Sequence, residues 1–411
     1  MTRAVKFCNN AVVVCYCALV FFLPISIALV ESFAGAVILF YLLKKVFAWD
    51  LKPHGSLLAG AMFGNILVVL TTVFFSKFFM VSLFAFFAKF IEGCFLYYSF
   101  VECFDRKQYI RWFIRVLAFS AAVIALSGLS QYFFHYEFVR HMPLESGRIS
   151  STFRNANDFG AYLIPISSLI LAFLLMYVSS AGLRVWHKAL LAALMVLPLA
   201  CLGLTYSRSS WGGFFVAMVL IGVMCRSMMY NVLLITVFLA VFLPLMMIQR
   251  NVSFVSDNLT RSAVVTQTFG GMGRMEFWRE AEKIIKQFPL FGSGLNTYSR
   301  VAPGYKINWG GYPHNCYLQM AAETGIVGLV SFLVLMGVLF FRGWRSIARM
   351  KDLFLKSAAL GAYAGLAGFL LQSGLDTTLY SVQLANLMWI LMGLIVAAIH
   401  VDGLTKEGKG L

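Results

Sequence analysis

The sequence predicts an all-α integral membrane protein with about twelve transmembrane helices. Hydrophobic residues make up 61% of the 411 residues and charged residues only 12%, and the mean hydropathy is +0.82. This composition lies outside the range of soluble globular domains. The apolar residues also fall in blocks of roughly 17 to 25, the length that a helix needs to cross the hydrocarbon core of a bilayer. Continuous blocks of this kind indicate spanning helices and not barrel strands.

The apolar blocks predict the individual spans and a single polytopic domain covering 1–411. The first block follows a short basic tail (Arg3 and Lys6) and has no small-residue cleavage site after it, so we interpret it as a retained helix and not as a signal peptide. No internal repeat or second soluble domain is evident. The predicted spans are 11–30, 33–48, 56–75, 78–100, 113–133, 159–179, 188–205, 211–225, 231–248, 316–340, 357–375 and 380–400.

The distribution of Lys and Arg predicts the orientation of these spans. With both termini in the cytoplasm, 19 Lys and Arg lie on the cytoplasmic side, and the short connections on the other side hold 5. Such an asymmetry is what the positive-inside rule requires. The formal net charge of +16 is therefore explained by membrane orientation, and no nucleic-acid partner is expected.

The segment 249–315 is the one long predicted extramembrane stretch, and it connects the ninth and tenth spans on the outer side. Between residues 274 and 288, apolar residues recur at helical spacing. This pattern predicts an amphipathic helix that ends before Pro289. The apolar face of this helix comprises Phe277, Ala281, Ile284, Ile285 and Phe288.

Arginines in the short outer connections are exceptions to the positive-inside rule, so each of them requires another explanation. Arg140 and Arg148 are explained equally well by contact with lipid headgroups. Arg208 is harder to explain in that way, because it lies in the short polar turn Thr205-Tyr-Ser-Arg-Ser-Ser210 between two spans. Arg274 begins the amphipathic helix just after a glycine-rich run, where free backbone N–H groups add to its charge; pairing with Glu280 is the simpler alternative.

Motifs for nucleotide chemistry are absent from the sequence. It has no P-loop, no GxGxxG after a strand, no HExxH and no DxD pair. An enzyme on the outer face would therefore need a substrate that is already activated in the membrane, such as a lipid-linked diphosphate. The planar guanidinium fork of Arg208 and Arg274 suits such a group.

His314 is the candidate general base, because a neutral imidazole accepts a hydroxyl proton near pH 7. A lone histidine can equally have a structural role. The surroundings favour catalysis: Asn315 can orient neighbouring groups, and Asp376 in Ser373-Gly-Leu-Asp-Thr-Thr378 lies at the outer end of the eleventh span.

These residues together resemble the O-antigen ligase family. The resemblance rests on the ordered set of Arg208 in its Thr-Tyr-Ser-Arg-Ser-Ser turn, Arg274 before Phe277-Trp278, Pro289-Leu-Phe-Gly-Ser-Gly294, His314-Asn315-Cys-Tyr-Leu-Gln, and Glu323-Thr-Gly325. It covers about residues 150–380 by motif. Arg154 lies in Thr152-Phe-Arg-Asn-Ala-Asn-Asp158, a segment where relatives often have Asn-Pro-Asn. The Asn-Ala-Asn of this sequence departs from that pattern, which makes Arg154 a weaker candidate.

The resemblance implies a GT-C-like, metal-independent glycosyltransferase without a cofactor. It would transfer O-antigen polysaccharide from undecaprenyl diphosphate to a sugar hydroxyl of lipid A-core, in the inner membrane of a Gram-negative bacterium with the active site facing the periplasm. By this likeness Arg208, Arg274 and Arg154 bind the diphosphate, His314 activates the acceptor, and Asn315 and Asp376 support it.

Three alternatives stay open at this point. The same superfamily includes O-antigen polymerases, which join repeat units, and protein O-oligosaccharyltransferases, which we expect to have an added soluble C-terminal part that this chain lacks. A lipid-linked oligosaccharide flippase or other transporter is the alternative from a different class. Transporters often have charged residues at mid-membrane, and Lys89 and Glu92 in the fourth span are such a pair, although at this spacing they can neutralise each other.

Overall fold

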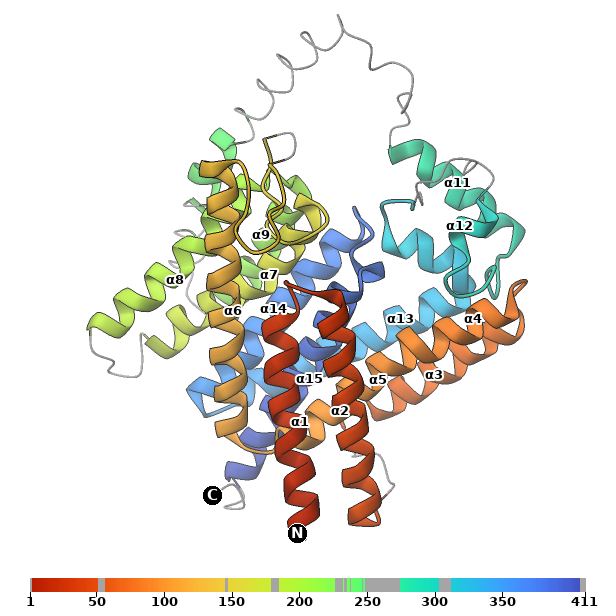
Figure 1. The fold of residues 1–411 in the computed structure, drawn as a ribbon, viewed down its shortest axis with the longest axis horizontal. Coiled ribbons are helices and arrows are strands. Elements are labelled where there is room, and N and C mark those ends of the chain that lie inside the picture. The colour runs from red at the N-terminus through yellow and green to blue at the C-terminus, as the bar shows by residue number, and fades with distance from the viewer. Residues whose placement is uncertain are drawn as a thin grey trace, which may run out of the picture.

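The computed structural model describes residues 2–50, 56–144, 147–178, 185–225, 274–302 and 312–406, together with 232, 235, 236, 238–245 and 247. These residues form a helical bundle (Figure 1). The helices are α1 (Arg3–Phe22), α2 (Ile27–Ala48), α3 (Ala59–Phe74), α4 (Phe79–Ala85), the π-helical η1 (Phe86–Ile91), α5 (Glu92–Cys103), α6 (Lys107–Phe134), α7 (Ala156–Ala172), the π-helical η2 (Phe173–Val178), α8 (Val185–Leu204), α9 (Arg208–Met224), α11 (Arg274–Gln287), α12 (Tyr298–Val301), α13 (Cys316–Arg349), α14 (Leu353–Ser373), the 3-10 turn η3 (Thr378–Tyr380) and α15 (Val382–Lys406).

The prediction of an all-helical integral membrane protein is confirmed. Within the described ranges, 8 helices are long and apolar enough to cross a membrane, and α3, α9 and residues 189–204 of α8 form shorter apolar helices. Together they cover eleven of the predicted spans. The ninth predicted span, 231–248, lies largely outside the described residues, so the total of twelve and the GT-C-like arrangement stay predictions.

The two ends of the bundle carry different elements. Helix α1 begins and α15 ends at one end, whereas α11 and α12 lie at the opposite end (Figure 1). We call this second end the outer end, following the predicted orientation. At the other end Lys44 and Lys45 from α2 both contact Glu102 of α5, at 3.3 and 2.7 Å. These two ion pairs join α2 to α5 near the helix ends that the sequence predicts to lie at the cytoplasmic surface.

Small residues bring α7, α9 and α14 into close contact. A Cβ atom on Gly213 of α9 would lie 2.5 Å from the carbonyl oxygen of Gly368 in α14. A Cβ on Gly365 would lie 2.5 Å from Cα of Pro165 in α7. Membrane helices use such positions because backbones can then approach each other and gain van der Waals contact. The tight packing fixes the relative positions of the outer ends of α7, α9 and α14.

Helix α13 is interrupted at Gly325, which has a left-handed backbone with φ 69°. The segment 289–298 packs into this break. The amide of Gly294 donates to the carbonyl of Glu323 at 2.8 Å, and that of Ile326 donates to the carbonyl of Pro289 at 2.9 Å. The carboxylate of Glu323 accepts hydrogen bonds from the amides of Asn296 and Tyr298, at 2.9 and 3.1 Å. We call this arrangement the 289–298 latch.

Candidate functional site

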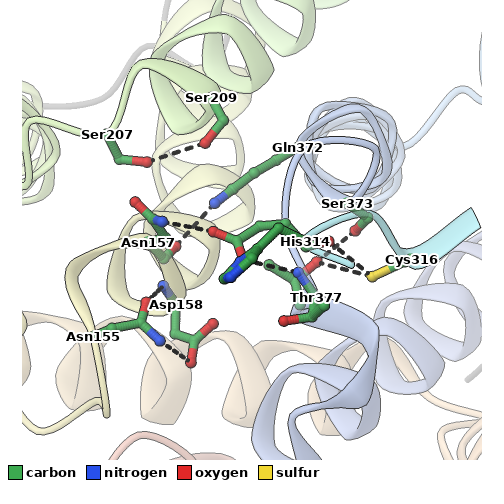
Figure 2. A network of polar contacts seen from close by, with 12 residues as sticks. Asn155, Asn157, Asp158, Ser207, Ser209, His314, Cys316, Gln372, Ser373 and Thr377 are labelled. Atoms are coloured by element: carbon green, nitrogen blue, oxygen red, sulfur yellow. Dashed lines mark hydrogen bonds and ion pairs between the residues drawn. The ribbon is translucent and has the colours of Figure 1, made fainter. Parts of the chain in front are cut away.

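His314 and Asp376 meet at the outer end of the bundle. His314 precedes α13 and Asp376 follows α14, and Nδ1 of the imidazole lies 3.2 Å from Oδ1 of the carboxylate (Figure 2). The His314 side chain is 44% exposed, while that of Asp376 is only 8% exposed. With the carboxylate accepting the Nδ1 proton, Nε2 keeps its lone pair on the accessible ring. This is the geometry that a general base and its orienting partner require.

Several donors hold the Asp376 carboxylate in place. The amide of Thr377 donates to Oδ1 at 2.9 Å, and Nδ2 of Asn157 donates to Oδ2 at 2.6 Å. Burial alone would raise the pKa of Asp376, but the hydrogen bonds from His314, Thr377 and Asn157 and the charge of His314 hold it below its ordinary value. The carboxylate is therefore kept ionised. The thiol of Cys316 donates to the Asp376 carbonyl at 3.1 Å, which fixes the loop that carries the acid.

Asn157 connects this pair to an arginine. Its side-chain oxygen accepts a hydrogen bond from Nη2 of Arg148 at 2.8 Å, and its carbonyl accepts one from Nε2 of Gln372 at 2.9 Å. Nε of Arg148 donates to the carbonyl of Thr205 at 2.8 Å. Arg148 thus bridges the start of α7 and the turn between α8 and α9. Its contacts are with protein, which favours a role in the site over the lipid-headgroup alternative.

Three arginines share this region. Burial lowers the pKa of Arg148; the charge of Asp376 opposes this change, and the positive charges of Arg274 and Arg208 add to it. Arg208 is the first residue of α9 and Arg274 the first of α11, and both are exposed. Among the described residues, neither guanidinium has a recorded hydrogen bond or ion pair, so the alternative pairing of Arg274 with Glu280 is not observed. Two exposed guanidinium groups near this site form an arrangement suited to a multiply charged anion.

Helix α11 brings Arg274 to His314. The ring of Phe277 meets the imidazole edge-to-face, with 5.7 Å between centroids. On the rest of its apolar face, Ala281 and Ile284 are buried against Tyr298 and Ala322, with Ile285 and Phe288 packed beside them. The predicted amphipathic helix is confirmed, because α11 spans Arg274–Gln287 and buries the face that the sequence indicated.

The remaining predicted residues have different positions. Asn315 is the N-cap of α13, and its side-chain oxygen accepts from the amides of Tyr317 and Leu318, each at 3.0 Å. Its support for His314 is therefore to fix where the helix begins. Arg154 is exposed and interacts electrostatically with Asp158 of α7. Asp158 in turn bonds Asn155, the N-cap of α7 (Figure 2).

Three site residues were not singled out as candidates from the sequence: Asn157, Gln372 and Phe277. Asn157 belongs to the Asn-Ala-Asn segment noted for Arg154, and Phe277 belongs to the apolar face of α11. Only the fold shows that Asn157 contacts Asp376, that Gln372 contacts the backbone of Asn157, and that Phe277 contacts His314. For Arg148 the sequence offers one indication, which is that an arginine in a short outer connection is an exception to the positive-inside rule.

Comparison with known families concerns the middle of the chain. A family model described as O-antigen ligase matches residues 193–333. The match supports assigning the chain to the O-antigen ligase family. The matched region contains Arg208, Arg274 and His314, while Asp376 and Arg148 lie outside it. No curated protein matches the sequence. A match to this family model supports a role in the O-antigen ligase and polymerase superfamily and suggests a glycosyltransferase-like activity.

Proposed function

We propose that this protein transfers a glycan from a polyprenyl diphosphate, undecaprenyl diphosphate in bacteria, to a sugar hydroxyl of lipid A-core. The observation that supports this most directly is the grouping of Arg148, Arg208 and Arg274 beside the His314–Asp376 pair. The arginines match the charge of a diphosphate. The partly exposed imidazole matches a base that acts on a hydroxyl.

The reaction follows from the chemistry of these groups. Nε2 of His314 takes the proton of the acceptor hydroxyl as the oxygen attacks the anomeric carbon of the donor. The bond between that carbon and the diphosphate oxygen breaks, and the electron pair leaves with the diphosphate. Arg208 and Arg274 stabilise the charge that develops there, a contribution that grows in the transition state. Asp376 stabilises the imidazolium that forms. No metal or nucleotide takes part in this scheme.

The site belongs to the outer end of the bundle, which we assign to the periplasmic face of the inner membrane. The excess of Lys and Arg at the opposite end supports this orientation. Because ATP is absent from the periplasm, cleavage of the bond between the anomeric carbon and the diphosphate has to supply the free energy of transfer. Ligation is the reaction we favour, since the outer segment with its helix from Arg274 is compact: α11 packs on His314 through Phe277 and on α13 through Ala281 and Ile284.

A reconstituted assay tests the proposal. Purified protein in liposomes is given undecaprenyl-diphosphate-linked glycan and lipid A-core, without ATP and with a chelator of divalent metals. We expect glycan to appear on lipid A-core. Longer lipid-linked chains without any product on lipid A-core would identify a polymerase, and loss of activity with chelator would refute the metal-independent scheme.

Matched variants test the roles of the residues. Arg208→Ala and Arg274→Ala are each expected to lower kcat by about 10²-fold to 10³-fold, the usual effect of removing a donor that stabilises developing charge. Arg279→Ala, an exposed arginine on the same helix as Arg274, serves as the control. His314→Ala is compared with His141→Ala, another outer-loop histidine with positive φ. Wild-type rates in the Arg208, Arg274 and His314 variants would exclude this site.

A further inference from the structure

Asp158 is an acid beside the site that the proposed reaction does not use. It lies in the first turn of α7, next to Asn157, in the group of polar side chains that includes His314 (Figure 2). Among the described residues, the charges that act most strongly on its carboxyl group are those of Asp376, Arg154 and His314. Asp158 is therefore placed near the base and its orienting acid.

One oxygen of the Asp158 side chain is held, and the other is open. Oδ2 accepts a hydrogen bond from Nδ2 of Asn155 at 2.9 Å, and the backbone amide of Asp158 donates to Oδ1 of Asn155 at 2.9 Å. Oδ1 of Asp158 has no hydrogen-bond partner among the described residues, and it is not a buried atom. The side chain of Asn155 thus fixes the direction of a carboxyl group that keeps an open oxygen.

The oxygens of Asp376, in contrast, are already engaged. Oδ1 bonds His314 and the amide of Thr377, and Oδ2 bonds Asn157. The Asp376 side chain is also only 8% exposed. Of these two acids, Asp158 is therefore the one that can form a hydrogen bond with a ligand.

Stability of α7 alone does not explain an acid at this position. A negative charge in the first turn of a helix is favourable because of the helix dipole. However, the charge of Asp376 disfavours a charge on Asp158 more strongly than the hydrogen bond from Asn155 favours it. Arg154 attracts Asp158 but forms no ion pair with it in the described structure. An asparagine would fill the same place without the repulsion, which points to a ligand as the reason for the acid.

The chemistry of an open carboxyl oxygen selects hydroxyl groups over phosphate. A hydroxyl both donates and accepts, so it can bond a carboxyl group in either protonation state. Phosphate oxygens are negatively charged acceptors, which suit the arginines instead. In the proposed reaction the hydroxyl groups nearest His314 belong to two sugars, the first sugar of the donor and the acceptor sugar. A sugar ring is consequently the class of ligand that fits Asp158.

We propose that Asp158 is a sugar-binding residue of this site and that its open oxygen bonds a ring hydroxyl of the sugar next to His314. The inference rests on the proposed glycosyl transfer and adds to it a contact that orients a sugar. Donor and acceptor sugars share the required hydroxyl chemistry, and paired ligands distinguish them.

Equilibrium binding tests the proposal without any transfer step. Wild type and Asp158→Ala in nanodiscs are titrated with two pairs of lipids, which are undecaprenyl diphosphate with and without its glycan and lipid A with and without its core sugars. We expect Asp158→Ala to bind at least one of the longer lipids about tenfold or more weakly, the usual effect of losing a hydrogen bond to a charged group. The shorter member of that pair should bind as it does to the wild type. The pair that changes identifies the sugar as that of the donor or the acceptor.

Two further variants control for folding. Asp158→Asn keeps a hydrogen-bonding side chain of the same size, so it should recover part of the lost affinity. Asp352→Ala removes the acid that caps the start of α14, and it should leave all four affinities unchanged. Unchanged binding of both longer lipids by Asp158→Ala would overturn the proposal, as would an equal loss for the longer and shorter members of a pair. The transfer reaction would then stand without this contact, whereas a wild-type protein that binds neither longer lipid would refute the reaction itself.

Discussion

His314 has the left-handed backbone conformation, with φ 49°. This conformation costs a residue other than glycine roughly 1–2 kcal/mol, so neighbouring contacts have to maintain it. Asn315 caps α13 directly after it, Asp376 bonds its Nδ1, and Phe277 packs against its ring. The imidazole is consequently oriented before a substrate arrives, as expected for a strained residue at a functional site.

Asp376→Asn tests the orienting role of the acid at the residue scale. The amide keeps the shape of the carboxylate but does not stabilise an imidazolium, so we expect kcat to fall by about 10²-fold or more with KM for the donor little changed. Asp352→Asn is the matched control, because Asp352 caps the opposite end of α14. Asparagine caps a helix about as well as aspartate, so this variant should change stability little and leave kcat near the wild-type value. Equal effects of the two variants would mean that Asp376 only stabilises the helix end.

The depressed pKa of Asp376 also predicts how the stability of the two proteins depends on pH. A carboxyl group whose pKa is lower in the folded state contributes stability above its unfolded value, near 3.9, and loses it as the pH falls through the folded value. The difference in Tm between wild type and Asp376→Asn should thus be largest near pH 7 and shrink below about pH 5. Thermal unfolding in detergent from pH 7 to pH 3 measures it, and a difference that grows in acid would contradict the assignment.

The sequence identifies the site residues whose chemistry is unusual for their position. Arg208 lies in a short outer turn, where an arginine is an exception to the positive-inside rule, and His314 has Asn315 beside it in a loop at the start of a span. Asn157 cannot be recognised in this way, because an asparagine after a helix N-cap is common in sequences. Its importance comes from the packing of α7 against α14, which brings residues 157 and 376 together, and that pairing is a long-range property of the fold.

At the scale of elements, the Glu323-Thr-Gly325 motif explains how α11 stays beside His314. The motif does not contact the predicted diphosphate site directly. Its glutamate binds the backbone of the 289–298 latch, and its glycine breaks α13 so that the latch fits. Because α11 ends where the latch begins, the latch sets the position of the helix that carries Arg274 and Phe277.

Gly325→Ala should disrupt this element. A Cβ atom there would lie 2.0 Å from the carbonyl oxygen of Leu290, and the φ of 69° disfavours any side chain. We expect the free energy of unfolding to fall by about 2 kcal/mol or more, with faster proteolysis near residues 289–298. Gly337→Ala in the same helix is the control, since a Cβ there meets nothing within 4 Å. Unchanged proteolysis in Gly325→Ala would show that the latch does not depend on the break.

At the scale of the whole molecule, hydropathy predicts the apolar helices well, because lipid allows few other structures. It does not predict which helices touch. The contact of α7, α9 and α14 depends on glycines whose role is visible only from a neighbouring backbone. Helix α13 extends to Arg349, beyond the predicted end at residue 340, because hydropathy does not register the polar last turns.

The close packing of α9 and α14 links the fold to the site, which makes Gly213 a test of the whole arrangement. Arg208 begins α9, and Asp376 follows α14, so separating these helices moves the arginine away from the His314–Asp376 pair. Gly213→Ala should therefore cost about 1–3 kcal/mol of unfolding free energy and also lower the transfer rate. Gly212→Ala places the same methyl group one residue earlier, where nothing lies within 4 Å, and should be neutral or slightly stabilising. Thermal unfolding and the transfer assay measure both effects, and a Gly213→Ala protein that is destabilised but fully active would show that the site tolerates movement of α9.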